Sequence, residues 1–109
     1  MHQLTGFQRD LLYCAASLDD PYGLEIGREV EEYSSLELNN GRLYQNLNAL
    51  VEKGLIKKKH KDDRTILYIV TSEAEKIIEN RQKWEGKKLE EAGIEVNWDR
   101  YLRASGRTK

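Results

Sequence analysis

The apolar residues between positions 43 and 70 predict a helix followed directly by a β-hairpin. The helix carries leucines spaced by four and three, which places them on one face: Leu43, Leu47 and Leu50. Gly54 then ends the helix, because glycine tolerates the left-handed conformation found after a last turn. Two strand-like runs follow at residues 55–60 and 66–70, and the aspartates between them favour a turn. This stretch therefore contains a helix and a hairpin with a charged tip.

The same spacing of apolar residues predicts two helices before this stretch. Thr5 can cap the first, since its hydroxyl can accept a bond from a free amide two or three residues on. Its core-facing stripe comprises Leu4, Phe7, Leu11, Cys14, Ala15 and Leu18. Residues 19–23, which include the lone proline, break this helix. A second helix spans about residues 24–33, and its inner face holds Ile26, Val30 and Tyr33.

Residues 34–38 connect the second helix to the third, and we expect them to add a short third strand. Asn39 or Asn40 is the expected cap of the third helix.

A long helix is predicted after the hairpin, beginning at Thr71 or Ser72 and ending at Gly93. Its apolar side is interrupted by polar residues and consists of Ala74, Ile77, Ile78, Arg81, Trp84, Leu89 and Ala92. Beyond it, Asn97 could cap a short helix that carries apolar side chains at i, i+3 and i+4: Trp98, Tyr101 and Leu102.

A series of residues through the third helix and the hairpin matches a known pattern. The series is Gly41-Arg42-Leu43-Tyr44, Leu47, Leu50, Lys53-Gly54-Leu55-Ile56, Asp62-Asp63-Arg64-Thr65, Tyr68 and Thr71. Over roughly residues 4–85 it resembles the recognition helix, the wing and the entry to the last helix of the PadR-like winged-helix transcriptional regulators. Gln45 stands where that family usually has proline, and Ala74 where it often has glycine. Because Gln45 is expected to face DNA, the family's target sequences do not transfer to this chain.

The resemblance implies a mainly α fold with a small β-hairpin, namely a winged helix-turn-helix with a C-terminal dimerisation helix. Residues 1–71 would form the DNA-binding domain and residues 72–109 the helical dimerisation segment. A chain of 109 residues builds only a modest core, so burying more surface in a homodimer would stabilise it. The expected interface residues are Ile77, Ile78, Arg81, Trp84, Leu89, Trp98 and Tyr101. Aromatic residues at this interface could also line a pocket for a small-molecule effector.

Charge is distributed unevenly along the chain, although the net charge is only −1. Residues 1–38 carry two arginines against eight carboxylates, and residues 39–69 carry seven cations against three anions. The positive segment is the one whose shape would enter a groove of double-stranded DNA. The lysine run at 57–59 alone could equally be a solvated face, but beside the helix pattern it favours DNA as the partner.

The geometry of the third helix selects its DNA-facing residues. At 100° per residue, the side opposite the three leucines holds Gln45, Asn48, Ala49 and Arg42, with Tyr44 on the flank as either a core-edge aromatic or a phosphate contact. Arginine can grip guanine and side-chain amides can grip adenine. Near the helix start, amides point at phosphate. The expected DNA-binding residues are Asn40, Gly41, Arg42, Tyr44, Gln45 and Asn48, with Lys59, His60, Lys61 and Arg64 of the wing on backbone phosphates or in a minor groove.

Motifs for catalysis or metal binding do not stand out in the sequence, so an enzyme, a metal site and a cofactor are not expected. Two histidines and one cysteine are too few and too scattered for a metal site. Cys14 lies in an apolar stripe, which favours a buried structural thiol. No run of about 18 apolar residues occurs, and the N-terminus lacks the pattern of a secretion signal. We therefore expect a cytoplasmic protein that does not cross a membrane.

The sequence predicts a homodimeric, sequence-specific transcriptional regulator, most simply a repressor. The helix at about 40–53 would read the major groove, and the wing at about 57–68 would contact the backbone or a minor groove. A second hypothesis is a winged-helix module for protein–protein interaction that uses its basic wing on an acidic partner. The acidic segment at 1–38 and the near-zero net charge are compatible with it.

Overall fold

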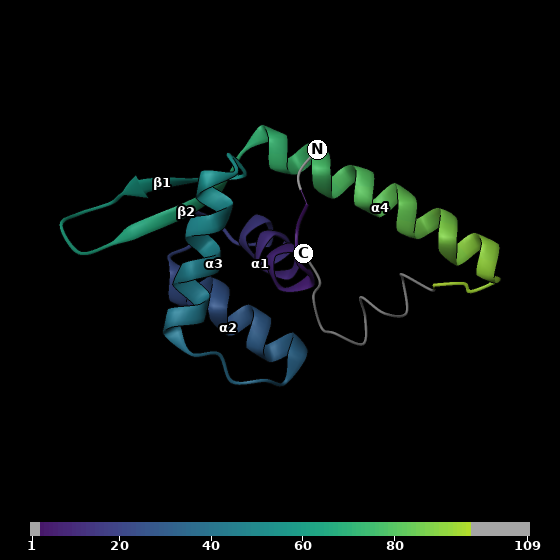
Figure 1. Ribbon diagram of the computed structural model, residues 1–109, viewed down its shortest axis with the longest axis horizontal. Coiled ribbons are helices and arrows are strands. Elements are labelled where there is room, and N and C mark those ends of the chain that lie inside the picture. Colours follow the sequence, from purple (N-terminus) through teal and green to yellow (C-terminus); the bar gives the residue numbers. More distant parts are fainter. Residues whose placement is uncertain (1–2, 97–109) are drawn as a thin grey trace. The chain divides into compact units, whose positions relative to one another are not determined.

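A computed structural model describes residues 3–96, which form four helices and one two-stranded antiparallel sheet (Figure 1). In chain order the elements are α1 (Gly6–Ser17), α2 (Gly23–Ser34), α3 (Asn40–Glu52), β1 (Ile56–His60), β2 (Ile66–Val70) and α4 (Ser72–Ala92). This order confirms the predicted fold class. The chain divides into two compact units, Met1–Ile78 and Glu79–Lys109. That division falls inside α4, and the domain boundary expected at residue 71 stays a prediction.

Helix ends follow the capping chemistry expected from the sequence. The Thr5 hydroxyl accepts a bond from the Gln8 amide at 3.1 Å, and the Gln8 side chain accepts one from the Thr5 amide at 3.3 Å. At α3 the cap is Asn39, whose Oδ1 accepts from the Arg42 amide at 2.7 Å. After α3, Gly54 takes a φ of 76°, which ends the helix as predicted.

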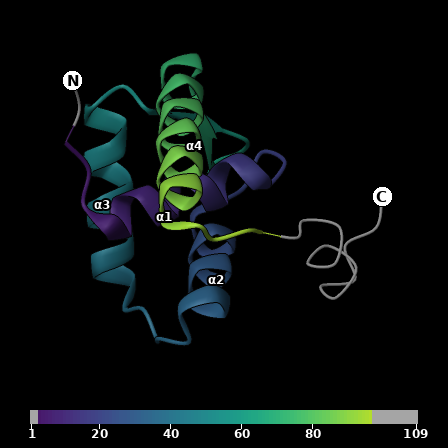
Figure 2. The ribbon, with the colours of Figure 1, turned by 90° about the vertical axis from the view of Figure 1, so that its right-hand side faces the viewer.

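The core of the first unit lies where α1, α2 and α3 pack against one another (Figure 2). Leu11, Ile26, Leu43, Leu47 and Leu50 are at most 2% exposed. The predicted stripe of α1 omitted Leu12, which is also fully buried. It included Phe7 and Cys14, which are half-buried and border the core. Helix α1 therefore buries a broader face than the sequence periodicity indicates. On α2 the prediction that Tyr33 faces inward is wrong, since this residue near the end of the helix is 81% exposed.

The hairpin formed by β1 and β2 pairs Ile56 with Val70 and His60 with Ile66. The short third strand expected at residues 34–38 is wrong. That segment is held at the end of α2 instead, because Glu31 Oε2 accepts from the Leu38 amide at 2.8 Å. Tyr22 forms a bridge to Leu67, and the Pro21 carbonyl accepts from the Tyr68 amide at 2.8 Å. The extended backbone that lines up with β2 is therefore at 21–22.

Helix α4 begins within the first unit. The Thr71 hydroxyl accepts from the Ala74 amide at 3.3 Å and donates to the Gly54 carbonyl at 2.8 Å, which ties the start of α4 to the end of α3. Ala74 is buried, and the two isoleucines that follow pack against the same core: Ile77 and Ile78. The predicted start of α4 is thus confirmed.

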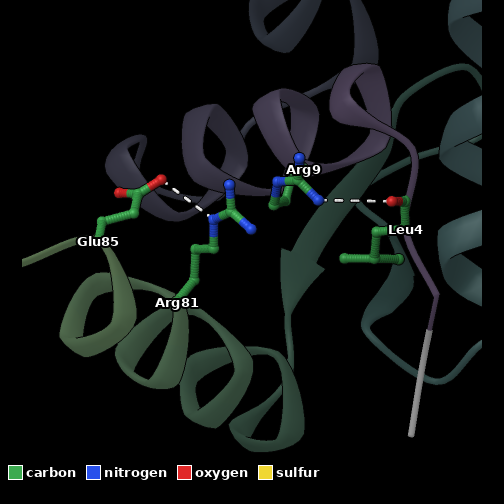
Figure 3. A network of polar contacts seen from close by, with 4 residues as sticks. All are labelled: Leu4, Arg9, Arg81 and Glu85. Atoms are coloured by element: carbon green, nitrogen blue, oxygen red, sulfur yellow. Dashed lines mark hydrogen bonds and ion pairs between the residues drawn. The ribbon is translucent and has the colours of Figure 1, made fainter. Parts of the chain in front are cut away.

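Short polar contacts order the surface within each unit (Figure 3). In the first unit, Arg9 Nη1 donates to the Leu4 carbonyl at 3.4 Å. In the second, Arg81 Nε donates to Glu85 Oε2 at 3.0 Å, one turn along α4. Gly93, with a φ of 71°, follows the end of α4 as expected.

A glycine on α2 provides a test of how tightly α2 and α3 pack. A Cβ at Gly27 would lie 2.9 Å from Leu43 Cδ2, whereas one at Gly86 of α4 would meet nothing within 4 Å. Because Leu43 is only 2% exposed, Gly27→Ala should lower the free energy of unfolding by about 1–3 kcal/mol. Gly86→Ala is the matched control and should raise it by about 0.5–1 kcal/mol. Urea denaturation measures both, and an equal gain from the two substitutions would contradict the close packing.

Candidate nucleic-acid interface

The free face of α3 is polar and open to solvent. Leu43, Leu47 and Leu50 turn one side of the helix into the core. On the opposite side Gln45 and Asn48 are exposed, where the helical geometry predicted them, while Ala49 is half-buried; Gly41, near the helix start, is also exposed. Asn40, the first residue of α3, is exposed beside them. The amide side chains of this face and the free backbone N–H groups at the helix start are thus presented to solvent together.

One flank of this face adjoins α1. The Arg42 guanidinium lies over the Phe7 ring, with its central carbon 4.2 Å from the ring centroid. Asn46 donates to the Arg42 carbonyl at 2.8 Å, and Gln8 of α1 donates to Asn46 at 3.1 Å. Arg42 therefore stands at the α1 edge of the face and not at its centre. No local pattern predicts this stacking, because Phe7 lies 35 positions away from Arg42.

The other flank carries Tyr44, which is half-buried. A Cβ on Gly23 would be only 2.6 Å from Tyr44 Cε1, so the ring packs directly on the backbone at the start of α2. Its centroid also lies 6.4 Å from that of Tyr68, with the rings tilted by 49°. Tyr44 consequently serves as a core-edge aromatic, whether or not it also reaches phosphate.

The wing, defined as residues 56–70, presents its cations outward. Lys59, His60, Lys61 and Arg64 are all exposed. Asp62 Oδ1 accepts from the backbone amides of Arg64 at 2.9 Å and Thr65 at 2.8 Å. The bond from the Arg64 amide, followed by that from Thr65, lowers the pKa of Asp62. The carboxylate is thereby used to fix the turn, and the basic side chains remain available.

A pocket of about 310 Å³ lies between α2, α3 and the wing. We call it the wing pocket, and its lining residues are Tyr22, Leu24, Tyr44, Arg64, Thr65, Ile66 and Tyr68. Burial, followed by the neighbouring Tyr44, raises the pKa of Tyr68, so this hydroxyl stays protonated and can donate. Of these lining residues the sequence predicted only Tyr44 and Arg64 as site residues, because the bridge that brings residue 22 beside residue 67 has no local signature.

The residues expected at a dimer interface fall into three groups. Ile77 and Ile78 are half-buried against the core of their own unit. In the second unit Trp84 is 50% exposed, and the Arg81 guanidinium lies 4.6 Å from its ring centroid. Leu89 is half-buried farther along α4. Trp98 and Tyr101 lie outside the described residues.

Other chemistries find little support among residues 3–96. No group of three or more His, Cys, Asp or Glu in that range could hold a metal ion. Burial, with smaller effects from Glu29 and Asp10, raises the pKa of Cys14 to about 11, so the thiol is protonated at neutral pH and poorly nucleophilic. None of the helices in that range is long and apolar enough to cross a membrane.

Among solved structures, the chain is similar to RosR of H. salinarum. One RosR structure, grown from NaBr, is 37% identical over 96% of this chain and 90% of that chain, with a TM-score of 0.73. A second, the complex structure of RosR-S1, is 38% identical over 94% of this chain and 87% of that chain, with a TM-score of 0.74. No curated protein matches the chain.

A more distant neighbour is Streptococcus pneumoniae FabT in complex with DNA. It is 14% identical over 95% of this chain and 71% of that chain, with a TM-score of 0.67, and this likeness shows the fold alone. The Transcriptional regulator PadR-like family matches residues 11–80, which include α2, α3 and the wing. The chain therefore belongs to the PadR-like family of winged-helix transcriptional regulators, which are DNA-binding proteins and not enzymes.

Proposed function

We propose that this protein is a homodimeric, sequence-specific regulator that represses transcription by occupying a promoter. The observation that carries the proposal is the exposed polar face of α3 beside the exposed cations of the wing. Both belong to one compact unit. The polar face of α3 suits base edges, and the cations of the wing suit phosphates.

In this proposal α3 enters the major groove. Gln45 and Asn48, at the centre of its exposed face, would form paired hydrogen bonds with adenine. Arg42 would reach guanine or a phosphate from the α1 edge. Asn40 and Gly41 would approach a phosphate at the helix start, where free amides and the helix dipole favour an anion.

The wing would hold the protein in register. Lys59, His60, Lys61 and Arg64 would contact backbone phosphates or enter a minor groove, with Tyr44 at the base of the wing. Each phosphate neutralised by lysine or arginine releases counterions, so affinity should fall steeply with salt. The glutamates of α2 at positions 29, 31 and 32 would remain behind α3.

The second unit would supply the dimer contact. Trp84 and Leu89 offer apolar surface on a helix whose other exposed residues are mostly charged. Pairing α4 with its copy would cover this surface and relate two copies of α3 by a two-fold axis, so that they meet half-sites about one turn of DNA apart. Such an interface could also enclose a small-molecule effector. The expected cytoplasmic location would give the protein access to DNA.

Substitutions on α3 and in the wing should have different effects on DNA binding. Gln45→Ala or Asn48→Ala should cost about 1–3 kcal/mol of discrimination between a specific and a scrambled duplex. The triple substitution of Lys59, Lys61 and Arg64 by alanine should weaken binding to both duplexes and flatten the salt dependence. Fluorescence anisotropy with DNA from just upstream of the protein's own gene measures both effects.

Lys57→Ala removes one charge at the other end of β1, away from the turn, and should weaken binding less than the triple variant does. Weak, salt-independent binding of the unmodified protein to every duplex would refute the proposal. In that case the wing would be tested on acidic proteins, as the second hypothesis requires.

Replacing Trp84 should disrupt the dimer. Because exposed tryptophans often dominate interface energies, Trp84→Ala should raise the dimer dissociation constant about tenfold or more. Gln82→Ala changes an exposed polar residue on the same helix and should leave it unchanged. Sedimentation equilibrium gives the constants, and equal values for the two variants would place the interface elsewhere.

A further inference from the structure

The wing pocket lies between the two elements that would contact DNA. Tyr44 lines it from α3, and Arg64 lines it from the wing. The hairpin projects to one side of α3 (Figure 1). With α3 in the major groove and the wing at the adjoining minor groove, the strand that separates the two grooves must cross the gap between them. The wing pocket lies between these two elements.

We propose that the wing pocket clamps one backbone phosphate of that strand, with its sugar, and that Tyr22 joins Arg64 in contacting DNA. This inference rests on the proposed function. It adds a defined phosphate site and brings the start of α2 into the interface.

The lining matches a sugar-phosphate unit chemically. Arg64 makes no ion pair with residues 3–96, and Asp62 Oδ1 accepts from backbone amides of the turn instead. Its guanidinium can therefore bind two phosphate oxygens. The hydroxyls of Tyr22 and Tyr68 are further donors, whereas the Thr65 hydroxyl bonds to Asp62 and helps to hold the turn that carries Arg64. Leu24 and Ile66 supply apolar surface for the deoxyribose.

The pocket is already assembled in the free protein. The bond from the Tyr68 amide to the Pro21 carbonyl and the bridge between Tyr22 and Leu67 hold the start of α2 against β2. The Tyr44 ring is fixed against Gly23. Binding a phosphate would thus require little ordering of these walls, which favours affinity. A volume of about 310 Å³ lies at the low end for ligand sites and suits one small unit.

The acidity of α2 does not oppose this arrangement. Its glutamates are concentrated in later turns of the helix, at positions 29, 31 and 32, and none of them lines the pocket. Glu25 is nearer, but its Oε1 accepts from the Tyr22 amide at 3.0 Å and so helps to hold Tyr22 in place. The pocket itself contains one cation and no carboxylate.

The test combines two substitutions with single neutral phosphates. Arg64→Ala and Tyr22→Phe would be compared by anisotropy across roughly 50–200 mM salt, using the upstream duplex and copies that each carry one methylphosphonate. Arg28→Ala and Tyr33→Phe are the controls, since both residues are exposed on α2 and do not line the pocket. Tyr22→Phe keeps the ring, and thermal denaturation would check that every variant folds.

We expect Arg64→Ala to reduce the slope of log K against log salt by about one. Tyr22→Phe should weaken binding about threefold or more without changing the slope, because it removes a hydrogen bond and no charge. At one methylphosphonate position the unmodified protein should lose affinity relative to the unmodified duplex. Arg64→Ala and Tyr22→Phe, which already bind more weakly, should show no further loss of affinity at that position.

The proposal is overturned if Arg64→Ala and Tyr22→Phe behave like their controls, or if every methylphosphonate weakens all variants equally. The proposed function would still stand in that case, provided that the unmodified protein binds DNA with the expected salt dependence. If the unmodified protein binds no duplex, both inferences are refuted.

Discussion

Burial of the leucine face of α3 is the constraint on which the rest of the interface depends. Leu43, Leu47 and Leu50 are at most 2% exposed, and each contributes roughly 1.5–3 kcal/mol by leaving water. Rotating α3 by one residue, about 100°, would move these leucines out of the core. The same burial therefore fixes which polar residues face outward. Gly27 and Gly23 reinforce this orientation of α3, because the absence of a side chain at each lets Leu43 and Tyr44 pack close to α2.

Hydrogen bonds tie both ends of the hairpin to the end of α3. The orientation of α3 therefore also determines where the wing and the start of α4 lie. Gly54 reverses the chain, and its carbonyl accepts the Thr71 hydroxyl at the start of α4. The Thr71 amide donates to the Leu55 carbonyl at 3.0 Å. The two ends of the hairpin are thus fixed at one point beside the core. The start of α4 is thereby tied to the end of α3 within the first unit.

Local patterns in the sequence predicted the order of the elements, most of their ends and the outward side of α3. These features depend on residues within one or two turns of each other, as with Thr5 and Gln8 or Asn39 and Arg42. Contacts between distant residues could not be read in this way. The stacking of Arg42 on Phe7 and the bridge of Tyr22 to Leu67 depend on how helices pack in three dimensions. The expected strand at 34–38 failed for a more local reason, since the Leu38 amide bonds to Glu31 near the end of α2.

The bridge at Tyr22 changes how the charge of the chain should be understood. Counted along the sequence, residues 1–38 are strongly acidic and would be assigned to the side away from DNA. In the fold, the start of α2 carries neutral aromatic and apolar side chains into the wing pocket beside Arg64. Exposed charges interact mainly over the Debye length of about 8–10 Å. Affinity for phosphate is consequently decided by the groups that surround it, and a protein with a net charge of −1 can still present a local anion site.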